Sequence, residues 1–127
     1  MSAHTLFGTV SGHLIDHEDP DPSLFTIEDI AHSLALINRY NGHLQCGPYS
    51  VAQHSVLVSF ACAQGDEREG LMHDAAEYLT GDFSRGLKNI PEIDDALSPF
   101  DRMIHIRLAR KFGYGEDIPP SVKLADD

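Results

Sequence analysis

The sequence contains no tryptophan, only two cysteines and no apolar run long enough to cross a bilayer. Cys46 and Cys62 form no CxxC pair and are too few for a disulfide framework. The N-terminus lacks the basic segment followed by an apolar segment that marks a secretion signal. We therefore expect a cytoplasmic protein that does not associate with membranes.

Basic residues are also scarce, because nine Lys and Arg stand against twenty Asp and Glu, for a formal net charge of −11. Nucleic-acid polymers select proteins with positive patches, so this balance argues against such a partner. It does not exclude a small phosphate compound, whose charge a metal ion and a few fixed cations can shield locally. With 127 residues, 42% of them hydrophobic, the chain suits one soluble globular domain.

The hydrophobic pattern after residue 25 is helical. Apolar residues recur at three- and four-residue steps in a first helix that Thr26 can cap and that Asn41-Gly42 would end. A second helix is expected to open with a capping box, in which Ser50 and Gln53 satisfy each other's backbone groups, and to run to about residue 65.

Three further segments complete the predicted fold. A third helix is expected over about 67–79, followed by a loop over 81–90. A fourth begins at Pro91 or Pro99, where Ser98 before Pro99 fits a cap and first turn. Residues 121–127 are only the opening of a last helix, because a helix needs about 12 residues to be more than marginal without packing.

The first 25 residues have a different composition, rich in Gly, Asp, Pro and His. The Asp19-Pro20-Asp21-Pro22 run favours an extended or turn conformation, since a residue before proline avoids the helical region. Residues 5–10 could form a short strand or one arm of a hairpin. We therefore expect an all-α domain of about five helices over 26–127, with its last helix truncated, preceded by an extended N-terminal arm over 1–25.

Histidine is abundant, with eight residues in the chain. One of them, His73, begins a segment in which several side chains could bind a metal ion. On a helix His73 and Glu77 are four residues apart and Asp74 and Glu77 are three apart, so the three side chains are neighbours. An imidazole beside two carboxylates suits a divalent cation. A His-Asp pair taken alone, however, is more typical of an exposed, charged helix face.

Two other residues favour a metal site over an exposed helix face. His54 lies between apolar neighbours in the middle of the second expected helix, where a single histidine is most simply a core residue. Asp126 follows an apolar stretch, where a buried carboxylate is costly without a partner. A metal ion shared with the His-Asp pair would account for both residues.

The order of His54, then His73-Asp74, then Asp126 resembles that of the HD-domain metal-dependent phosphohydrolases, and most of all the bacterial and phage 5′-deoxynucleotidase-like members. In these an Arg followed by an aromatic residue precedes the first histidine, as Arg39-Tyr40 does here. Their His-Asp pair opens a segment much like residues 73–82 of this chain. The resemblance covers roughly residues 26–127 and is strongest over 49–88.

The resemblance implies an HD-type helical bundle with one divalent transition metal, such as Co, Mn or Zn, with Mg as an alternative. The implied metal ligands are His54, His73, Asp74 and Asp126. His105 would be a further ligand in a two-metal variant, but it lies so far after the His-Asp pair that one metal is preferred.

The resemblance also implies roles for residues around the metal. Glu77 would position or deprotonate the attacking water, and Arg39 would bind the phosphate as a planar fork. Asp82 would meet the sugar hydroxyls, and Lys88 would assist with the phosphate. The implied substrate-binding residues are thus Arg39, Tyr40, Asp82 and Lys88.

The implied activity is hydrolysis of the phosphate ester of (deoxy)nucleoside 5′-monophosphates. The same site would serve a triphosphohydrolase that releases triphosphate from a nucleotide such as dATP, because HD folds support both reactions. A non-catalytic nucleotide-binding HD protein would lack a water-activating carboxylate, so Glu77 argues against it. A purely structural helical module is the remaining alternative. The expected partners are a small nucleotide and further copies of this chain, as a homo-oligomer.

Overall fold

The computed structural model describes residues 3–127, and most of them are helical. The expected predominance of helix is confirmed, but the described residues contain seven α-helices rather than about five. No helix among them is long and apolar enough to span a membrane. The helices are α1 (Ile27–Leu36), α2 (Val51–Ala61), α3 (Glu67–Met72), α4 (Glu77–Thr80), α5 (Arg85–Lys88), α6 (Pro91–Phe112) and α7 (Pro120–Asp126).

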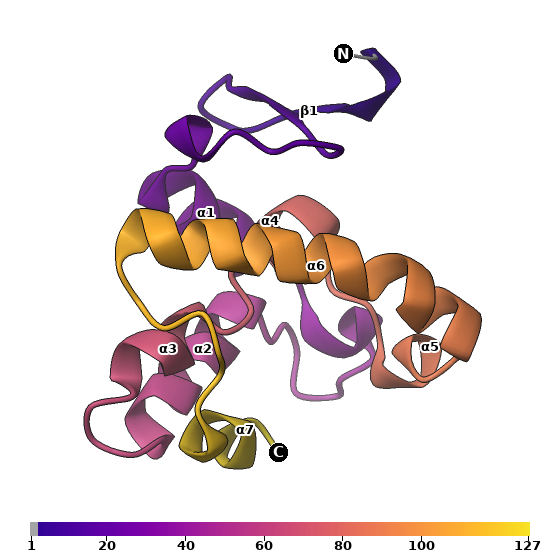
Figure 1. The fold of residues 1–127 in the computed structure, drawn as a ribbon. Helices are drawn as coiled ribbons and strands as arrows, with labels where there is room; N and C mark the ends of the chain where they lie inside the picture. The colour runs from indigo at the N-terminus through magenta and orange to yellow at the C-terminus, as the bar shows by residue number, and fades with distance from the viewer. Residues whose placement is uncertain (1–2) are drawn as a thin grey trace.

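In the view of Figure 1 the longest helix, α6, crosses the molecule in front of α1 and α4. An N-terminal hairpin lies on one side of α6, and α2, α3 and α7 lie on the other. The hairpin pairs β1 (Leu6–Gly8) with β2 (Leu14–Asp16) in antiparallel register. The residues expected as an extended arm thus form a small sheet, whose Ile15 is buried in the same core as the helices.

The start of α2 fits the predicted capping box. Gln53 N donates to Ser50 Oγ (3.0 Å), and Ser50 N donates to Gln53 Oε1 (3.1 Å). The helix ends at Ala61, earlier than expected. His54 lies one turn after the cap and is only 6% exposed, so the locally encoded start of α2 directs this imidazole inward.

The first helix also ends earlier than expected. α1 stops at Leu36 rather than at Asn41-Gly42. The residues that follow pair with the segment before α2, where Arg39 N donates to Tyr49 O (2.8 Å). Backbone groups used in this pairing cannot continue the helix. Residues Arg39–Gly42 instead form a tight turn, which begins at the predicted phosphate-binding arginine and in which Tyr40 and Asn41 depart from helical backbone angles.

The predicted third helix is interrupted at the His-Asp pair. α3 ends at Met72 and α4 begins at Glu77, with a turn between them. The backbone of His73 stays helical (φ −61°, ψ −29°), but hydrogen bonds here span three residues, as from Glu77 N to Asp74 O (3.0 Å). Tightening of this kind inside a helical stretch often marks a functional hinge or a sequence under strain.

The region after α4 differs from the expectation as well. Residues 85–88 of the predicted loop form α5. α6 begins at Pro91 and continues through Pro99, so Ser98 is not a cap. Its Oγ instead donates to Asp94 Oδ1 (2.7 Å) one turn earlier in the same helix. Pro91 suits the first turn because the amide hydrogen that proline lacks has no partner there in any helix.

Candidate metal centre and adjoining cleft

Nitrogen and oxygen donors from three separate segments converge at one point. One ligand atom from each of His54, His73, Asp74 and Asp126 lies within 4.8 Å of the others. His54 comes from α2, the His73-Asp74 pair from the turn between α3 and α4, and Asp126 from the end of α7. The fold therefore brings together all four residues that the sequence predicted as ligands.

The distances within this cluster are those of directly interacting groups. Asp126 Oδ1 lies 2.5 Å from His54 Nε2 and 3.3 Å from His73 Nε2. Asp74 Oδ2 lies 3.0 Å from His73 Nε2 and 4.0 Å from His54 Nε2. Both imidazoles are buried and both carboxylates are partly exposed, so the cluster opens to solvent on its acidic side.

His73 is oriented as metal-binding histidines usually are. Its Nδ1 donates to the carbonyl oxygen of Gly70 (2.6 Å), which fixes the ring and turns Nε2 toward the carboxylates. Burial lowers the pKa of His73, but hydrogen bonds to Asp126 and Asp74 prevail and raise it to about 10. The cluster therefore favours positive charge at Nε2, which a divalent cation also provides.

Asp126 is held in place although it lies near the chain end. Val122 on the same helix is fully buried, and Ser121 Oγ donates to Asp66 Oδ2 (2.6 Å). The hydrogen bond from His73, opposed by burial and assisted by His54, holds the pKa of Asp126 well below its usual range. The carboxylate is thus ionised and available to a cation at neutral pH.

Arg39 contacts the cluster from the other side. Its Nη1 donates to His54 Nδ1 (2.7 Å), and because a guanidinium cannot accept, Nδ1 must be the acceptor. In this arrangement His54 Nε2 carries the ring hydrogen and donates to Asp126. The guanidinium also lies 5.0 Å from the centre of the Tyr40 ring and 6.0 Å from that of Tyr49.

The backbone next to Arg39 is strained. Tyr40 (φ 57°) and Asn41 (φ 52°) both adopt the left-handed conformation, which costs an L-residue other than glycine roughly 1–2 kcal/mol. Backbone strain of this kind clusters at functional sites, where the surrounding structure enforces it. Here it accompanies the packing of the Tyr40 ring against the guanidinium, with about half of the tyrosine left exposed.

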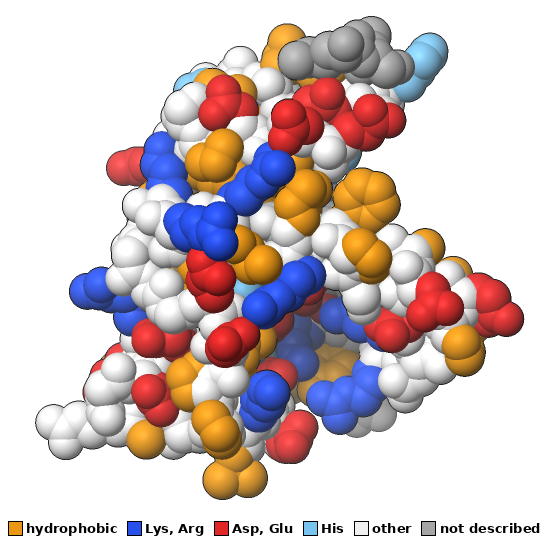
Figure 2. All heavy atoms as spheres, in the orientation of Figure 1, with side chains coloured by type: hydrophobic (Ala, Val, Ile, Leu, Met, Phe, Trp, Pro, Cys, Tyr) orange, Lys and Arg blue, Asp and Glu red, His pale blue; other side chains and the backbone are white. Residues whose placement is uncertain are grey.

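A cleft of about 440 Å³ adjoins the cluster, within the size range of small-molecule sites. Asp126 connects it to the candidate ligands, and Arg39, Tyr40 and Asp82 line it as predicted substrate-binding residues. Figure 2 shows this face hollowed between α5 and α7, with Lys and Arg side chains around the hollow. Positive charge thus gathers here in a chain whose total charge is strongly negative.

Arg85 also lines the cleft and was missed by sequence reasoning. It lies in the segment expected to be a loop, and its only signal was a cation three residues after Asp82. One exposed arginine near a motif carries little information, because most such side chains are simply solvated.

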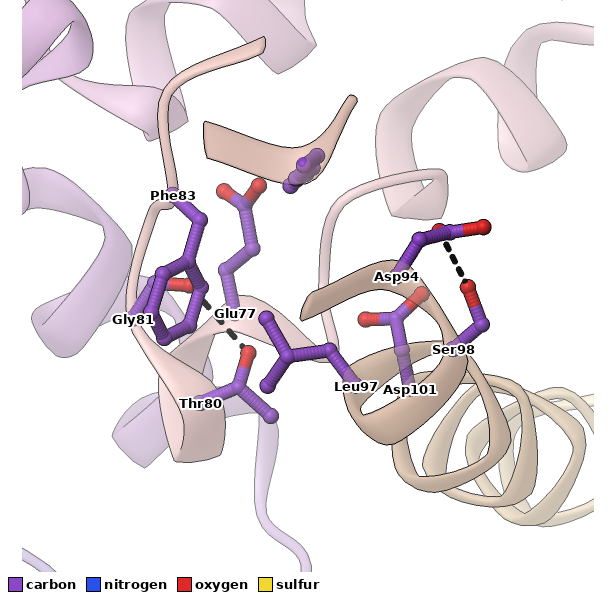
Figure 3. Close-up of a pocket in the computed structure, with 9 residues that line it drawn as sticks. Glu77, Thr80, Gly81, Phe83, Asp94, Leu97, Ser98 and Asp101 are labelled. Atoms are coloured by element: carbon purple, nitrogen blue, oxygen red, sulfur yellow. Dashed lines mark hydrogen bonds between the residues drawn. The ribbon is translucent and has the colours of Figure 1, made fainter. Parts of the chain in front are cut away.

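Glu77 and Lys88 line a neighbouring pocket, which shares Phe83 with the cleft. In Figure 3, Glu77 and Phe83 face Leu97 and Asp101 of α6 across this pocket. Of the predicted site residues, Lys88 is therefore grouped with Glu77 rather than with the residues that line the cleft.

Within the part of the chain that the structure describes, Glu77 Oε2 has no hydrogen-bond partner, although only 7% of the residue is exposed. Burial, followed by the negative charges of Asp74 and Asp82, raises the pKa of Glu77 to about 9, and Lys88 opposes this effect. A cation that compensates the charge of Asp74 removes one of these causes. The protonation state of Glu77 is thus coupled to the charge of the cluster.

His105, the candidate ligand for a second metal, lies elsewhere. It is buried in α6, and its Nε2 donates to the carbonyl oxygen of Glu116 (2.9 Å). The cluster of potential metal ligands found among the described residues does not include it. The structure therefore gives His105 a backbone hydrogen bond, and the candidate ligands that it brings together number enough for a single ion.

Comparison with known proteins gives relatives but no activity. No family model matches the chain. An uncharacterized protein of Rhodobacter capsulatus is 36% identical, over 91% of this chain and 62% of its own length. The uncharacterized protein YfdR of Escherichia coli is 36% identical, over 93% of this chain and 64% of its own length. The chain thus spans less than two thirds of these relatives, and their names state no activity.

Proposed function

We propose that this chain is a metal-dependent phosphohydrolase of the HD superfamily that releases inorganic phosphate from (deoxy)nucleoside 5′-monophosphates. The observation that carries the proposal is the convergence of two imidazoles and two carboxylates at the edge of a cleft that also holds an arginine. Mixed nitrogen and oxygen donors suit a divalent transition metal such as Co, Mn or Zn, and Mg would require a more oxygen-rich set.

In this proposal His54, His73, Asp74 and Asp126 hold the ion. When bound, the cation polarises a phosphoryl oxygen and makes water a better nucleophile near neutral pH. Two carboxylates and two neutral imidazoles balance its charge. The positive charge of Arg39 is then not neutralised and can attract an anion into the cleft.

Arg39 would bind the phosphate after leaving His54. A His54 that held the ion through Nε2 would carry its ring hydrogen on Nδ1, which could then no longer accept the hydrogen bond from Arg39. The freed guanidinium can offer two parallel N–H groups to phosphate oxygens. Tyr40 would limit the movement of Arg39 through the ring contact described above.

The remaining roles follow from burial and charge. Glu77 would orient the attacking water and accept its proton, since its Oε2 has no competing partner among the described residues. Lys88 favours the ionised form of Glu77 that a base requires. Asp82 lines the cleft and would accept hydrogen bonds from the sugar hydroxyls.

The proposal is tested by the leaving group. Purified protein is incubated with dAMP, other monophosphates and dATP in the presence of Mn²⁺, Co²⁺, Zn²⁺ or Mg²⁺, with Glu77→Gln as the inactive control. Release of inorganic phosphate from dAMP supports the proposal, and tripolyphosphate from dATP identifies a triphosphohydrolase instead. Nucleotide binding without turnover would indicate a non-catalytic HD protein, and protein that binds none of these metals would indicate a structural module.

We further propose that the chain forms a homo-oligomer through α2. This helix contains no charged residue and exposes Leu57 (57%) and Phe60 (81%), so like-charged copies can meet there with little repulsion. Leu57→Glu should convert the assembly to monomers in light scattering after size-exclusion chromatography. Leu14→Glu, at a similarly exposed leucine (62%) of the hairpin, is the matched control. A wild-type monomer would contradict the proposal.

A further inference from the structure

The six arginines of the chain divide into two groups. Four of them donate side-chain hydrogen bonds to backbone carbonyls or carboxylates outside their own turn. These are Arg68 with Gly113, Arg102 with Glu116 and Asp117, Arg107 with Asp19 and Pro20, and Arg110 with Glu116. The other two, Arg39 and Arg85, line the cleft.

Of these two, Arg39 is already engaged with His54, whereas the side chain of Arg85 makes no hydrogen bond within residues 3–127. Within the same residues its one ion pair is with Asp127, at 4.0 Å and between side chains that are about three-quarters exposed. Such a pair contributes little. The five N–H donors of Arg85 are therefore available to a ligand in the cleft.

The charges that line the cleft show what the free donors of Arg85 contribute to anion binding. Asp82 and Asp127 also line it, and both repel an anion. If Asp126 binds the metal, Arg39 by itself would face the two carboxylates of Asp82 and Asp127. Arg85 adds a second positive charge, so that two arginines offset two carboxylates. A phosphate monoester carries close to two negative charges at neutral pH and presents three free oxygens. A diester carries one charge and presents two.

We propose that Arg85 is a second phosphate-binding residue, which acts with Arg39 and makes the site selective for phosphate monoesters over diesters. The selectivity rests on the proposed function, whereas phosphate binding by Arg85 can be measured without turnover. The guanidinium binds oxygens of the same phosphate that Arg39 holds. Because α5 carries Arg85 and the segment after α1 carries Arg39, the two side chains come from separate parts of the chain.

The first test measures binding of inorganic phosphate by isothermal titration calorimetry, with protein equilibrated in Mn²⁺. Arg85→Ala should weaken phosphate binding at least tenfold, and Arg85→Lys should fall between it and the wild type, because a lysine keeps the charge but not the fork. Lys111→Ala removes an exposed positive charge away from the cleft and should change affinity less than twofold.

Arg85→Ala should also keep the thermal stability of the wild type, since the side chain is exposed and makes no hydrogen bond to any described residue. Wild-type affinity in Arg85→Ala, an equal loss in Lys111→Ala, or a wild type that binds no phosphate would each overturn the inference.

The second test compares a monoester, dAMP, with a diester, bis(p-nitrophenyl) phosphate. Arg85→Ala should raise KM for dAMP about tenfold and leave kcat/KM for the diester within twofold. A wild type that hydrolyses neither ester contradicts the proposed function, while the phosphate titration still decides whether Arg85 binds the anion. An active wild type with an unchanged KM in Arg85→Ala contradicts the inference alone.

Discussion

Two buried carboxylic acids, each in the first turn of a helix, behave in opposite ways in this protein. Asp29 of α1 is 2% exposed and Glu77 of α4 is 7% exposed. Burial acts against ionisation of both. The pKa of Asp29 is nevertheless lowered to about 2, whereas that of Glu77 is raised to about 9.

The difference lies in the hydrogen-bond donors around each carboxyl. Ser11 donates to Asp29 from its backbone N (3.2 Å) and from Oγ (2.7 Å), and His13 Nδ1 lies 3.5 Å away. These bonds outweigh burial and hold the hairpin on α1. Glu77 faces Asp74 and Asp82 instead, and its Oε2 has no partner within residues 3–127.

Burial alone therefore does not distinguish a structural acid from a chemical one. A buried carboxylate whose oxygens accept hydrogen bonds stabilises the fold. A buried carboxylate without hydrogen-bond donors around it is available for proton transfer. The histidines show the same contrast. His105 gives its Nε2 hydrogen to a backbone carbonyl, whereas His73 directs Nε2 at two carboxylates.

The largest effect is expected at Glu77. Under the proposed function, Glu77→Gln should lower kcat about 10²- to 10⁴-fold, the usual contribution of a general base. Its Mn²⁺ affinity should stay within a few fold of the wild type, because Glu77 is not a candidate ligand. Phosphate release and calorimetry measure the two quantities. A kcat within threefold of the wild type would show that Glu77 has no part in the reaction.

The next effect concerns the metal ligands. Asp126→Ala should weaken Mn²⁺ binding more than 100-fold, beyond the loss typical of residues that only support a ligand. Asp117→Ala is the matched control, because it removes an aspartate paired with Arg102 (2.9 Å) outside the cluster. Equal metal affinity in the two variants would contradict the assignment of the site.

Asp29 should affect stability instead of chemistry. Asp29→Asn replaces a charged acceptor of several hydrogen bonds, so the free energy of unfolding should fall by about 1–3 kcal/mol. Urea denaturation measures this change. The kcat of the folded variant should equal that of the wild type. A large loss of kcat with unchanged stability would show that Asp29, like Glu77, takes part in the reaction, and would contradict the structural role.

The smallest effects are opposite dependences of stability on pH. Asp29 has a folded pKa below its ordinary 3.8, so its stabilisation is present above pH 3.8 and is lost as the pH falls toward 2. Glu77 has a folded pKa above its ordinary 4.5. The contribution of Glu77 to the free energy of unfolding is therefore present below pH 4.5 and is lost as the pH rises toward 9.

Urea unfolding of metal-free protein between pH 2.5 and 9 measures both slopes. Glu77→Gln should flatten the loss of stability above pH 4.5, and Asp29→Asn should flatten the loss below pH 3.8. If Glu77→Gln leaves the alkaline slope unchanged, the carboxyl is ionised in the folded protein.

The sequence predicted those features that neighbouring residues encode. The Thr26 cap and the Ser50–Gln53 capping box are correct because each is a hydrogen bond over three residues. The set of candidate ligands also came from the sequence, through the order of histidines and aspartates and the resemblance that this order carries. The prediction was less successful for the ends of helices, where α1 stops early because Arg39 pairs with Tyr49, ten residues later.

By itself, then, the sequence determined the helical composition, the starts of two helices and the residues with metal-binding chemistry, because local periodicity and side-chain type fix these properties. Only the tertiary structure decided that His54 and Asp126, 72 residues apart, lie 2.5 Å from each other. It also decided that Glu77 Oε2 has no partner among the described residues while Asp29 has several, and that Arg85 lines the cleft. Hydrogen-bond satisfaction depends on which distant segments pack together, and no local pattern records it.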